Sequence, residues 1–160
     1  MHRDYDRMGE LLHALRGSRV DRMRAAADVL WEHLSCAGVS WVGFYTAEPG
    51  DVEMVLGPCR NKPACSPIGL HGACGQCWTN RRALVIADVA VMGDGYIACD
   101  PRDRSEVVVP LFDDAQCWGV LDVDSHRVGA FSARDAEQLD RLMVIAKLTG
   151  DGPREDPIEF

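Results

Sequence analysis

Three of the seven cysteines in the chain lie in short segments that are rich in Gly, Pro or acidic residues and are typical of turns. They are Cys65 in Lys-Pro-Ala-Cys, Cys74 in Gly-Ala-Cys-Gly and Cys99 in Ile-Ala-Cys-Asp. Three carboxylates follow them along the chain, namely Glu106, Asp122 and Asp124. Thiols in such turns are better placed for chemistry than for packing in a core. The combination suggests a thiol-based redox enzyme.

The cysteine count and the N-terminus bear on the redox state of these thiols. The first residues are charged and lead into no apolar segment, so we expect no signal peptide. No apolar run approaches the length of a membrane span. These features predict a cytoplasmic protein, in which thiols are kept reduced, and seven cysteines cannot all pair. We therefore expect reactive, metal-binding or buried cysteines rather than a structural disulfide framework.

Length and charge narrow the class of protein further. At 160 residues the chain fits one domain with a real hydrophobic core, and its 47% hydrophobic and 26% charged residues are ordinary for a soluble globular protein. The formal net charge is −8, and the arginines are scattered. Because binding to a phosphate backbone needs clustered Lys and Arg, the sequence argues against a nucleic-acid partner.

The hydrophobic periodicity predicts an α+β domain over residues 1–150, followed by a flexible acidic tail over 151–160. We expect a mainly antiparallel central sheet flanked by N- and C-terminal helices. Two irregular stretches, 58–72 and 91–104, hold one of the three cysteines each, and long loops of this kind are usually functional. The predicted helices cover 4–16, 19–36, 73–82 and 132–148, and the predicted strands cover 39–45, 53–57, 83–87, 106–112 and 117–124.

The strand pattern brings the acids together. Asp122 and Asp124 are two residues apart, so they point to one face of their strand while Leu121 and Val123 point to the other. Glu106 opens the preceding strand and is expected to converge on the same pocket. Because crowded carboxylates cannot all ionise cheaply, one of them should hold a proton near neutral pH.

Seven motifs follow one another along the chain: Trp-Val-Gly-Phe-Tyr (41–45), Leu-Gly-Pro (56–58), Lys-Pro-Ala-Cys (62–65), Gly-Ala-Cys-Gly (72–75), Ile-Ala-Cys-Asp (97–100), Arg-Ser-Glu-Val-Val-Val-Pro (104–110) and Gly-Val-Leu-Asp-Val-Asp-Ser (119–125). In content and order they resemble the free methionine-R-sulfoxide reductase family, which is built on a GAF domain. The similarity spans about residues 5–148. The chain departs from the family in the spacing of the second cysteine, in the segment Ser66–His71 and at Tyr96, which replaces a common His.

The resemblance implies a role for each cysteine and a reaction. Cys99 matches the catalytic cysteine, Cys65 the main resolving cysteine and Cys74 an auxiliary third cysteine. The implied reaction is reduction of free L-methionine (R)-sulfoxide to methionine through a sulfenic acid and an intramolecular disulfide. No bound cofactor is implied, and thioredoxin is the implied external reductant. GAF domains of this kind often pair through their terminal helices, which would give a homodimer.

The substrate pocket that the resemblance implies combines acids with aromatic rings. Its residues are Trp41, Tyr45, Glu106, Asp122 and Asp124. Glu106 and Asp124 are also expected to take part in catalysis. A protonated acid would donate to the sulfoxide oxygen while ionised neighbours bind an α-ammonium group, which methionine within a peptide lacks. The aromatic faces suit a methyl–sulfur group.

Other interpretations of the same residues stay open. A GAF domain can be a sensor that holds a small ligand or changes its disulfide state without catalysis. Cys74-Gly-Gln-Cys77 is a C-x-x-C pair, but it lacks the lead-in of a thioredoxin-like motif. A zinc site would use Cys65, His71, Cys74 and Cys77; these offer one close pair of ligands where structural sites usually have two, so we expect no metal.

Packing in a core is the simplest interpretation of other residues. Free cysteine is among the most buried residue types, so burial without reactivity is expected for Cys36, Cys59, Cys77 and Cys117. Trp41 and Tyr45 would equally suit a core. The two aspartates of the Leu-Asp-Val-Asp-Ser motif would equally suit a solvated strand face.

Overall fold

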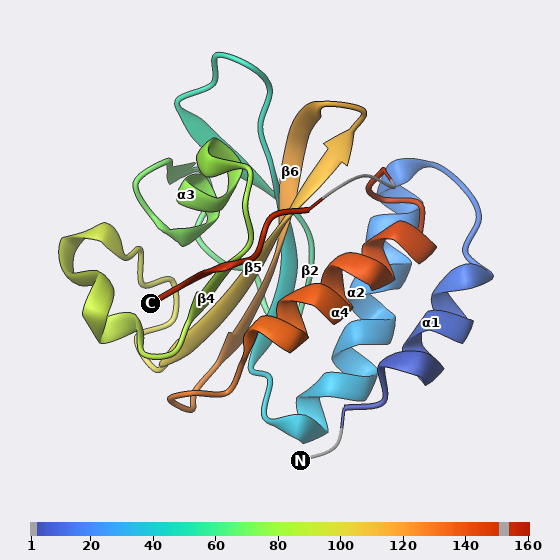
Figure 1. Ribbon diagram of the computed structural model, residues 1–160, viewed down its shortest axis with the longest axis horizontal. Coiled ribbons are helices and arrows are strands. Elements are labelled where there is room, and N and C mark those ends of the chain that lie inside the picture. The colour runs from blue at the N-terminus through green and yellow to red at the C-terminus, as the bar shows by residue number, and fades with distance from the viewer. Residues whose placement is uncertain (1–2, 151–153) are drawn as a thin grey trace.

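The computed structural model describes residues 3–150 and 154–160 (Figure 1). Its strands are β1 Trp41–Thr46, β2 Glu53–Arg60, β3 Ile68–Gly69, β4 Leu84–Ile86, β5 Ser105–Asp113, β6 Gln116–Ser125 and β7 Ile158–Glu159. They form one sheet in the order β3-β2-β1-β6-β5-β4-β7, and every neighbouring pair is antiparallel except β4 and β7. This confirms the predicted α+β domain with a mainly antiparallel sheet.

Three helices cover one face of the sheet: α1 Tyr5–His13, α2 Arg19–Leu34 and α4 Ala133–Ile145 (Figure 1). Their apolar faces pack on alternate strand residues such as Phe44, Val109 and Val123, all of them fully buried. Burying each such side chain contributes about 1.5–3 kcal/mol, so this layer is the main source of stability. Within the described part of the chain, none of the helices is long and apolar enough to cross a membrane.

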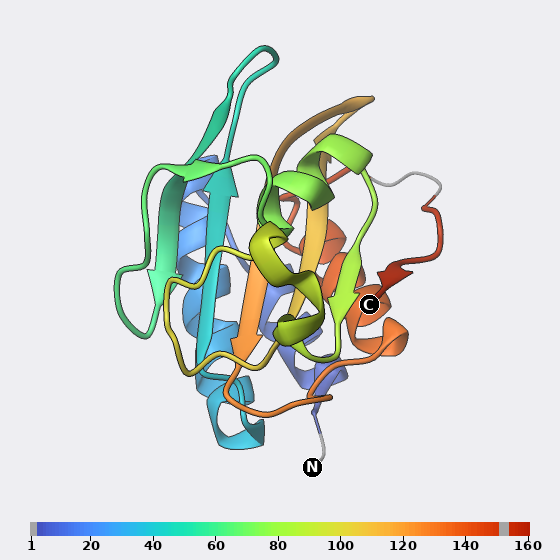
Figure 2. The same ribbon diagram turned by 90° about the vertical axis from the view of Figure 1, so that its left-hand side faces the viewer.

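The opposite face of the sheet carries short elements and long connections (Figure 2). The helix α3 Ala73–Asn80 and the 3₁₀ segment η2 Val89–Gly95 belong to this layer; a further 3₁₀ turn, η1 Ser35–Ala37, follows α2. A second buried cluster fills the space beneath them, and it includes Met54, Ile68, Leu84, Val108 and Val120. Because loops rather than long helices cover this face, it leaves room for a pocket.

The start of α4 is fixed by an acid at its first turn. The Ser132 backbone N–H and hydroxyl both donate to Asp135 Oδ2 at 2.8 Å, which is a helix-capping arrangement. Asp135 Oδ1 also accepts from the Tyr5 hydroxyl and from Arg3 Nη1, each at 2.6 Å. One carboxylate therefore caps α4 and holds α1 against it.

Most predicted elements are present, but two predicted irregular stretches contain structure. β2 extends to Arg60 because Leu56 and Cys59 pair with β1, although Gly57 and Pro58 favour a break. Pro58 has no partner in β1, because it falls in the irregularity of the β1–β2 register between Gly43 and Tyr45, and β3 pairs only with the start of β2. The stretch predicted as irregular over 91–104 overlaps η2.

The C-terminal segment differs from the predicted flexible tail. Residues 151–153 of that tail lie outside the described residues. Ile158 and Glu159 form β7, which pairs in parallel with β4, and the Ile158 N–H donates to the Ala83 carbonyl at 2.8 Å. Without β7, β4 would be an edge strand with unpaired backbone groups. Pairing with these groups orders the segment although its Pro and acidic residues disfavour regular structure. The homodimer stays a prediction.

Replacing Asp135 by Ala should lower the free energy of unfolding by about 1–3 kcal/mol, because it removes a helix cap and leaves two partners without an acceptor. Urea unfolding followed by circular dichroism measures this change. Glu137→Ala is the matched control. Glu137 is an exposed acid two residues further along the same helix, so its replacement should change the free energy of unfolding by less than about 0.5 kcal/mol. Equal losses in the two variants would contradict the capping role.

Candidate active site

Three carboxylates lie on the loop-covered face of two paired strands. Along β6, Asp122 and Asp124 alternate with Leu121 and Val123, which are buried in the cluster beneath the helices. Glu106 of β5 is directly opposite Asp124 in the antiparallel register. The structure brings all three acids to one pocket, where their relative exposures are 4% for Glu106, 6% for Asp122 and 9% for Asp124. The alternative of a solvated strand face is therefore wrong.

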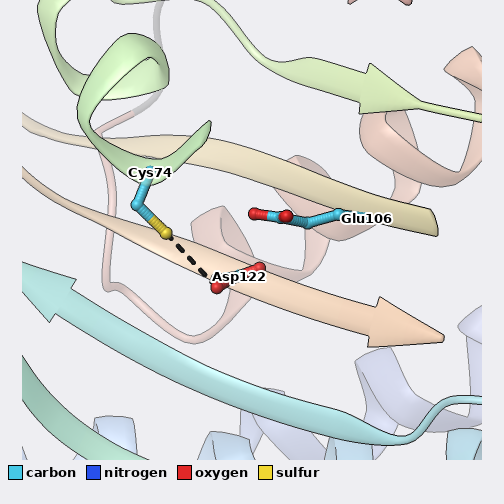
Figure 3. Close-up of side chains that lie close together, drawn as sticks. All are labelled: Cys74, Glu106 and Asp122. Carbon is cyan, nitrogen blue, oxygen red and sulfur yellow. Dashed lines mark hydrogen bonds between the residues drawn. The ribbon is translucent and has the colours of Figure 1, made fainter. Parts of the chain in front are cut away.

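Cys74 faces these acids from the first turn of α3 (Figure 3). Its Sγ donates a hydrogen bond to Asp122 Oδ2 at 3.2 Å, and one side-chain atom each of Cys74, Glu106 and Asp122 lies within 4.8 Å of the others. Asp122 Oδ1 is buried and has no hydrogen-bond partner among the described residues. α3 can approach its preceding loop because Gly75 has no side chain: a Cβ there would lie 2.2 Å from the Leu70 Cα.

Burial raises the pKa of each acid in the pocket. Desolvation is the main cause for Asp122, whose pKa rises to about 7. The pKa values of Glu106 and Asp124 rise well above the usual carboxyl range, first because of burial and then because the Asp122 charge lies nearby. Burial and the neighbouring carboxylates also raise the pKa of the Cys74 thiol. The pocket floor thus retains protons near neutral pH, and Cys74 is a thiol rather than a nucleophilic thiolate.

Two aromatic residues of β1 form a wall of the pocket. Trp41, Gly43 and Tyr45 share a strand face, and the two ring centroids lie 6.1 Å apart. A Cβ at Gly43 would lie 2.1 Å from Trp41 Cη2, so glycine allows the indole to lie across the strand. Trp41 Nε1 donates to the Lys62 carbonyl at 2.7 Å, and the Tyr45 hydroxyl donates to the Cys65 carbonyl at 2.8 Å. Both aromatic residues therefore line the pocket and hold the loop that carries Cys65.

Cys99 and Cys65 lie next to each other at the edge of this pocket. Cys99 is half-buried and lines the pocket, whereas Cys65 is exposed, and both thiols are free. Burial raises the pKa of the Cys99 thiol to about 12, and a hydrogen bond with the Cys65 side chain adds to the rise, while the Cys65 backbone N–H opposes it. The pair therefore has one sulfur on the pocket side and one on the solvent side.

Several further pocket residues were not assigned from the sequence, and three of them lie near Cys99 in the chain. The Tyr96 side chain hydrogen-bonds Glu106 and opposes the rise in its pKa. Ile97 lies against Gly72, where a Cβ would come within 2.7 Å of the Ile97 Cδ1. Asp103 is buried and accepts a hydrogen bond from the Ser40 hydroxyl at 3.1 Å. All three lie within four residues of Cys99, so proximity to that cysteine in an irregular stretch was the available signal.

The other cysteines only partly follow the expected burial. Cys77 and Cys117 are buried, as predicted. The prediction is wrong for Cys36, which is exposed in the 3₁₀ turn after α2, and Cys59 at the end of β2 is of intermediate exposure. Cys74 lies in the first turn of α3, within the helix predicted over 73–82, but it is buried rather than set in an accessible turn.

The four residues of the zinc alternative do not assemble. Cys65 is exposed on its loop while Cys77 is fully buried, and within the described residues they form no cluster at ligand distances with His71. The C-x-x-C alternative places both of its thiols in buried positions of α3, away from an external partner.

Known proteins resemble both the sequence and the fold. Residues 18–147 match the GAF domain family. The chain is 41% identical over 117 residues to the free methionine-R-sulfoxide reductase of Escherichia coli (strain K12), across 72% of this chain and 67% of that protein. The structure of the free methionine-R-sulfoxide reductase from Neisseria meningitidis in complex with its substrate superposes with a TM-score of 0.79 at 35% identity, covering 89% of this chain and 83% of that one. The substrate complex of fRMsr of Staphylococcus aureus gives a TM-score of 0.82 at 31% identity, with coverages of 94% and 98%.

Asp122→Asn should make the protein more stable than the wild type at pH 8 but not at pH 4. The raised pKa of Asp122 means that the folded state holds its proton more tightly than the unfolded state does, so this contribution is complete below about pH 4 and is lost as pH rises through about 7. The difference should grow to about 3–4 kcal/mol across that window. Urea unfolding at several pH values measures it.

Asp114→Asn is the control for this series, since Asp114 is exposed in the turn between β5 and β6. Its stability should follow the wild-type pH profile. A profile of Asp122→Asn that runs parallel to the wild type would contradict the assigned proton.

Proposed function

Because the chain belongs to the GAF domain family and, within it, to the free methionine-R-sulfoxide reductases, we propose that it reduces free methionine (R)-sulfoxide to methionine with Cys99 as the attacking thiol. The observation that carries this proposal is the placement of the Cys65–Cys99 pair. Cys99 lines a pocket whose floor consists of proton-holding carboxyl groups, and the second thiol contacts it from the solvent side.

The proposed first step transfers the sulfoxide oxygen to Cys99. An acid of the pocket donates a hydrogen bond or proton to the sulfoxide oxygen while the Cys99 sulfur attacks the sulfoxide sulfur. Methionine leaves as the thioether and Cys99 becomes a sulfenic acid, so the cysteine is oxidised by two electrons and the substrate is reduced by two. Because the pKa of Cys99 is about 12, the thiol proton must leave as the sulfur attacks, and the basic oxygen atoms of the site are its nearest destination.

The acids carry two proposed duties that their environment supports. Asp122 lies nearest to titration at neutral pH and has one oxygen with no partner among the described residues, which suits a contact with substrate. A substrate ammonium would in turn favour ionisation of neighbouring carboxylates such as Glu106 and Asp124. Catalysis by Glu106 and Asp124, and binding by all three acids, remain parts of this proposal.

A free amino acid carries two charges that match features of this pocket. Its ammonium group matches the acids, and its carboxylate matches the N-terminus of α3, where Gly72 and Ala73 line the pocket. Trp41 and Tyr45 offer their faces to the methyl–sulfur group. A methionine residue inside a peptide would bring neither charge.

The proposed cycle closes through an intramolecular disulfide. The Cys65 sulfur attacks the sulfenic sulfur of Cys99, the S–S bond forms and the oxygen leaves as water. Cys65 is exposed, so an external dithiol of the thioredoxin type can reach the disulfide and return two electrons. Such a cycle needs a reducing compartment, and we propose the cytoplasm. Cys74 is buried and hydrogen-bonded to Asp122, which favours an auxiliary role at most.

The purified protein should support oxidation of NADPH in a coupled assay with thioredoxin, thioredoxin reductase and free methionine (R)-sulfoxide. Free (S)-sulfoxide and a peptide that contains methionine sulfoxide should give little or no turnover, because the first presents the wrong face of sulfur and the second lacks the ammonium group. Absence of turnover with the free (R) form would overturn the proposal. Tight binding of that compound without turnover would instead favour the sensor alternative.

Cys65→Ser should release about one methionine per protein molecule and then stop, since the sulfenic acid on Cys99 would have no resolving partner. Mass spectrometry after dimedone treatment should locate the adduct on Cys99. Cys36→Ser, which removes an exposed cysteine outside the pocket, should cycle like the wild type. Normal cycling of Cys65→Ser would show that another thiol resolves the sulfenic acid.

A further inference from the structure

An ion pair joins the two loops that carry Cys65 and Cys99. Lys62 lies three residues before Cys65, and Asp100 directly follows Cys99. Lys62 Nζ donates to Asp100 Oδ2 at 2.5 Å, and the Asp100 side chain is only 9% exposed. The ion pair is therefore a direct polar link between the loops, close in sequence to both thiols.

Two backbone carbonyls of the Cys65 loop are bonded to side chains of β1, and the Cys65 backbone N–H contacts the Cys99 sulfur. Trp41 Nε1 holds the Lys62 carbonyl, and the Tyr45 hydroxyl holds the Cys65 carbonyl. These bonds hold the loop against β1. The Lys62 ammonium adds a contact in another direction, to Asp100 of the Cys99 loop.

Asp100 keeps its charge because its neighbours are cations and N–H groups. Arg102 donates to it through its backbone N–H and through Nε and Nη2, and Lys62 adds a further bond. These contacts, with those from Arg102 the largest, hold the pKa of Asp100 well below the usual carboxyl range. His126 Nε2 is 3.4 Å away. Asp100 therefore retains partners within its own loop even when Lys62 is removed.

We propose that Lys62 is a positioning residue for disulfide formation, because its ion pair with Asp100 keeps Cys65 against Cys99. The proposal rests on the proposed function. Neither Lys62 nor Asp100 lines the substrate pocket, so the pair should not act on oxygen transfer. It acts on the next step, in which the Cys65 sulfur displaces the sulfenic oxygen of Cys99 as water and the S–S bond forms.

Three variants distinguish the effect of the ion pair between the two loops from the effect of the bonds within the Cys99 loop. Lys62→Met removes the link and leaves Asp100 bonded to Arg102. Lys62→Arg keeps a cation that can pair with Asp100, so its rate of disulfide formation should stay close to that of the wild type. Arg102→Met is the matched control: it removes bonds to the same carboxylate, but only bonds within the Cys99 loop, so it should leave disulfide formation within about twofold of the wild type.

The test is a pre-steady-state experiment on the reduced full-length protein with free methionine (R)-sulfoxide and no reductant. Methionine release reports oxygen transfer, and loss of alkylatable thiols, with mapping of the disulfide, reports the second step. Lys62→Met should leave methionine release unchanged and slow disulfide formation about three- to tenfold, with more sulfenic acid trapped by dimedone. Raising the salt from about 0.02 M to about 0.5 M should slow the second step in the wild type but not in Lys62→Met.

An unchanged rate of disulfide formation in Lys62→Met would overturn the proposal. Equal slowing of methionine release, or equal slowing in Arg102→Met, would overturn it as well, because the effect would then lie in the pocket or within one loop. Failure of the proposed function looks different: the wild type itself would release no methionine or form no Cys65–Cys99 disulfide.

Discussion

Burial of three carboxyl groups on one face of the sheet is the constraint on which the site depends. Charged carboxylates lose much of their solvation at such positions, and three of them in contact repel one another. Glu106, Asp122 and Asp124 therefore hold protons that exposed acids would have released. In the proposed function, these carboxyl groups would bind the ammonium group of the substrate and donate a proton to its sulfoxide oxygen.

The stability that offsets this burial comes from the other face of the sheet. The helices α1, α2 and α4 cover Leu121 and Val123, which alternate with the two aspartates along β6. Successive residues of β6 thus point to opposite faces of the sheet, so that one set packs in the core and the other lines the pocket. Among the described residues, none of those that line the pocket belongs to these three helices, and the pocket face carries a smaller core of its own around Leu84 and Val108.

The sequence allowed the fold and the convergence of the acids to be predicted because both follow from periodicity. A two-residue spacing places Asp122 and Asp124 on one face, and short hairpin connections make the neighbouring strands antiparallel. Tertiary contacts decided what periodicity could not. β7 pairs with the edge of β4, Cys74 is buried where Gly75 lets α3 approach Leu70, and Cys36 is exposed in the 3₁₀ turn that follows α2. The positions of Tyr96, Ile97 and Asp103 depend on the path of a loop without repeating pattern, so their sequence gave no geometric signal.

The placement of acids on strands and thiols on loops matches what each must do. Hydrogen bonding to a bound group requires fixed positions, which β5 and β6 provide through their ladder. Disulfide formation requires two sulfur atoms to move from hydrogen-bonding contact to a bond of about 2.05 Å, which rigid strands would resist. Loops permit that approach but also permit separation, so the segment with Cys65 needs contacts that limit its range. The bonds from Trp41 and Tyr45 meet this need from the strand below, and the Lys62 ammonium meets it from the side. In the proposed function, the aromatic wall of the pocket would therefore hold the Cys65 loop through its polar atoms and contact the substrate through its ring faces.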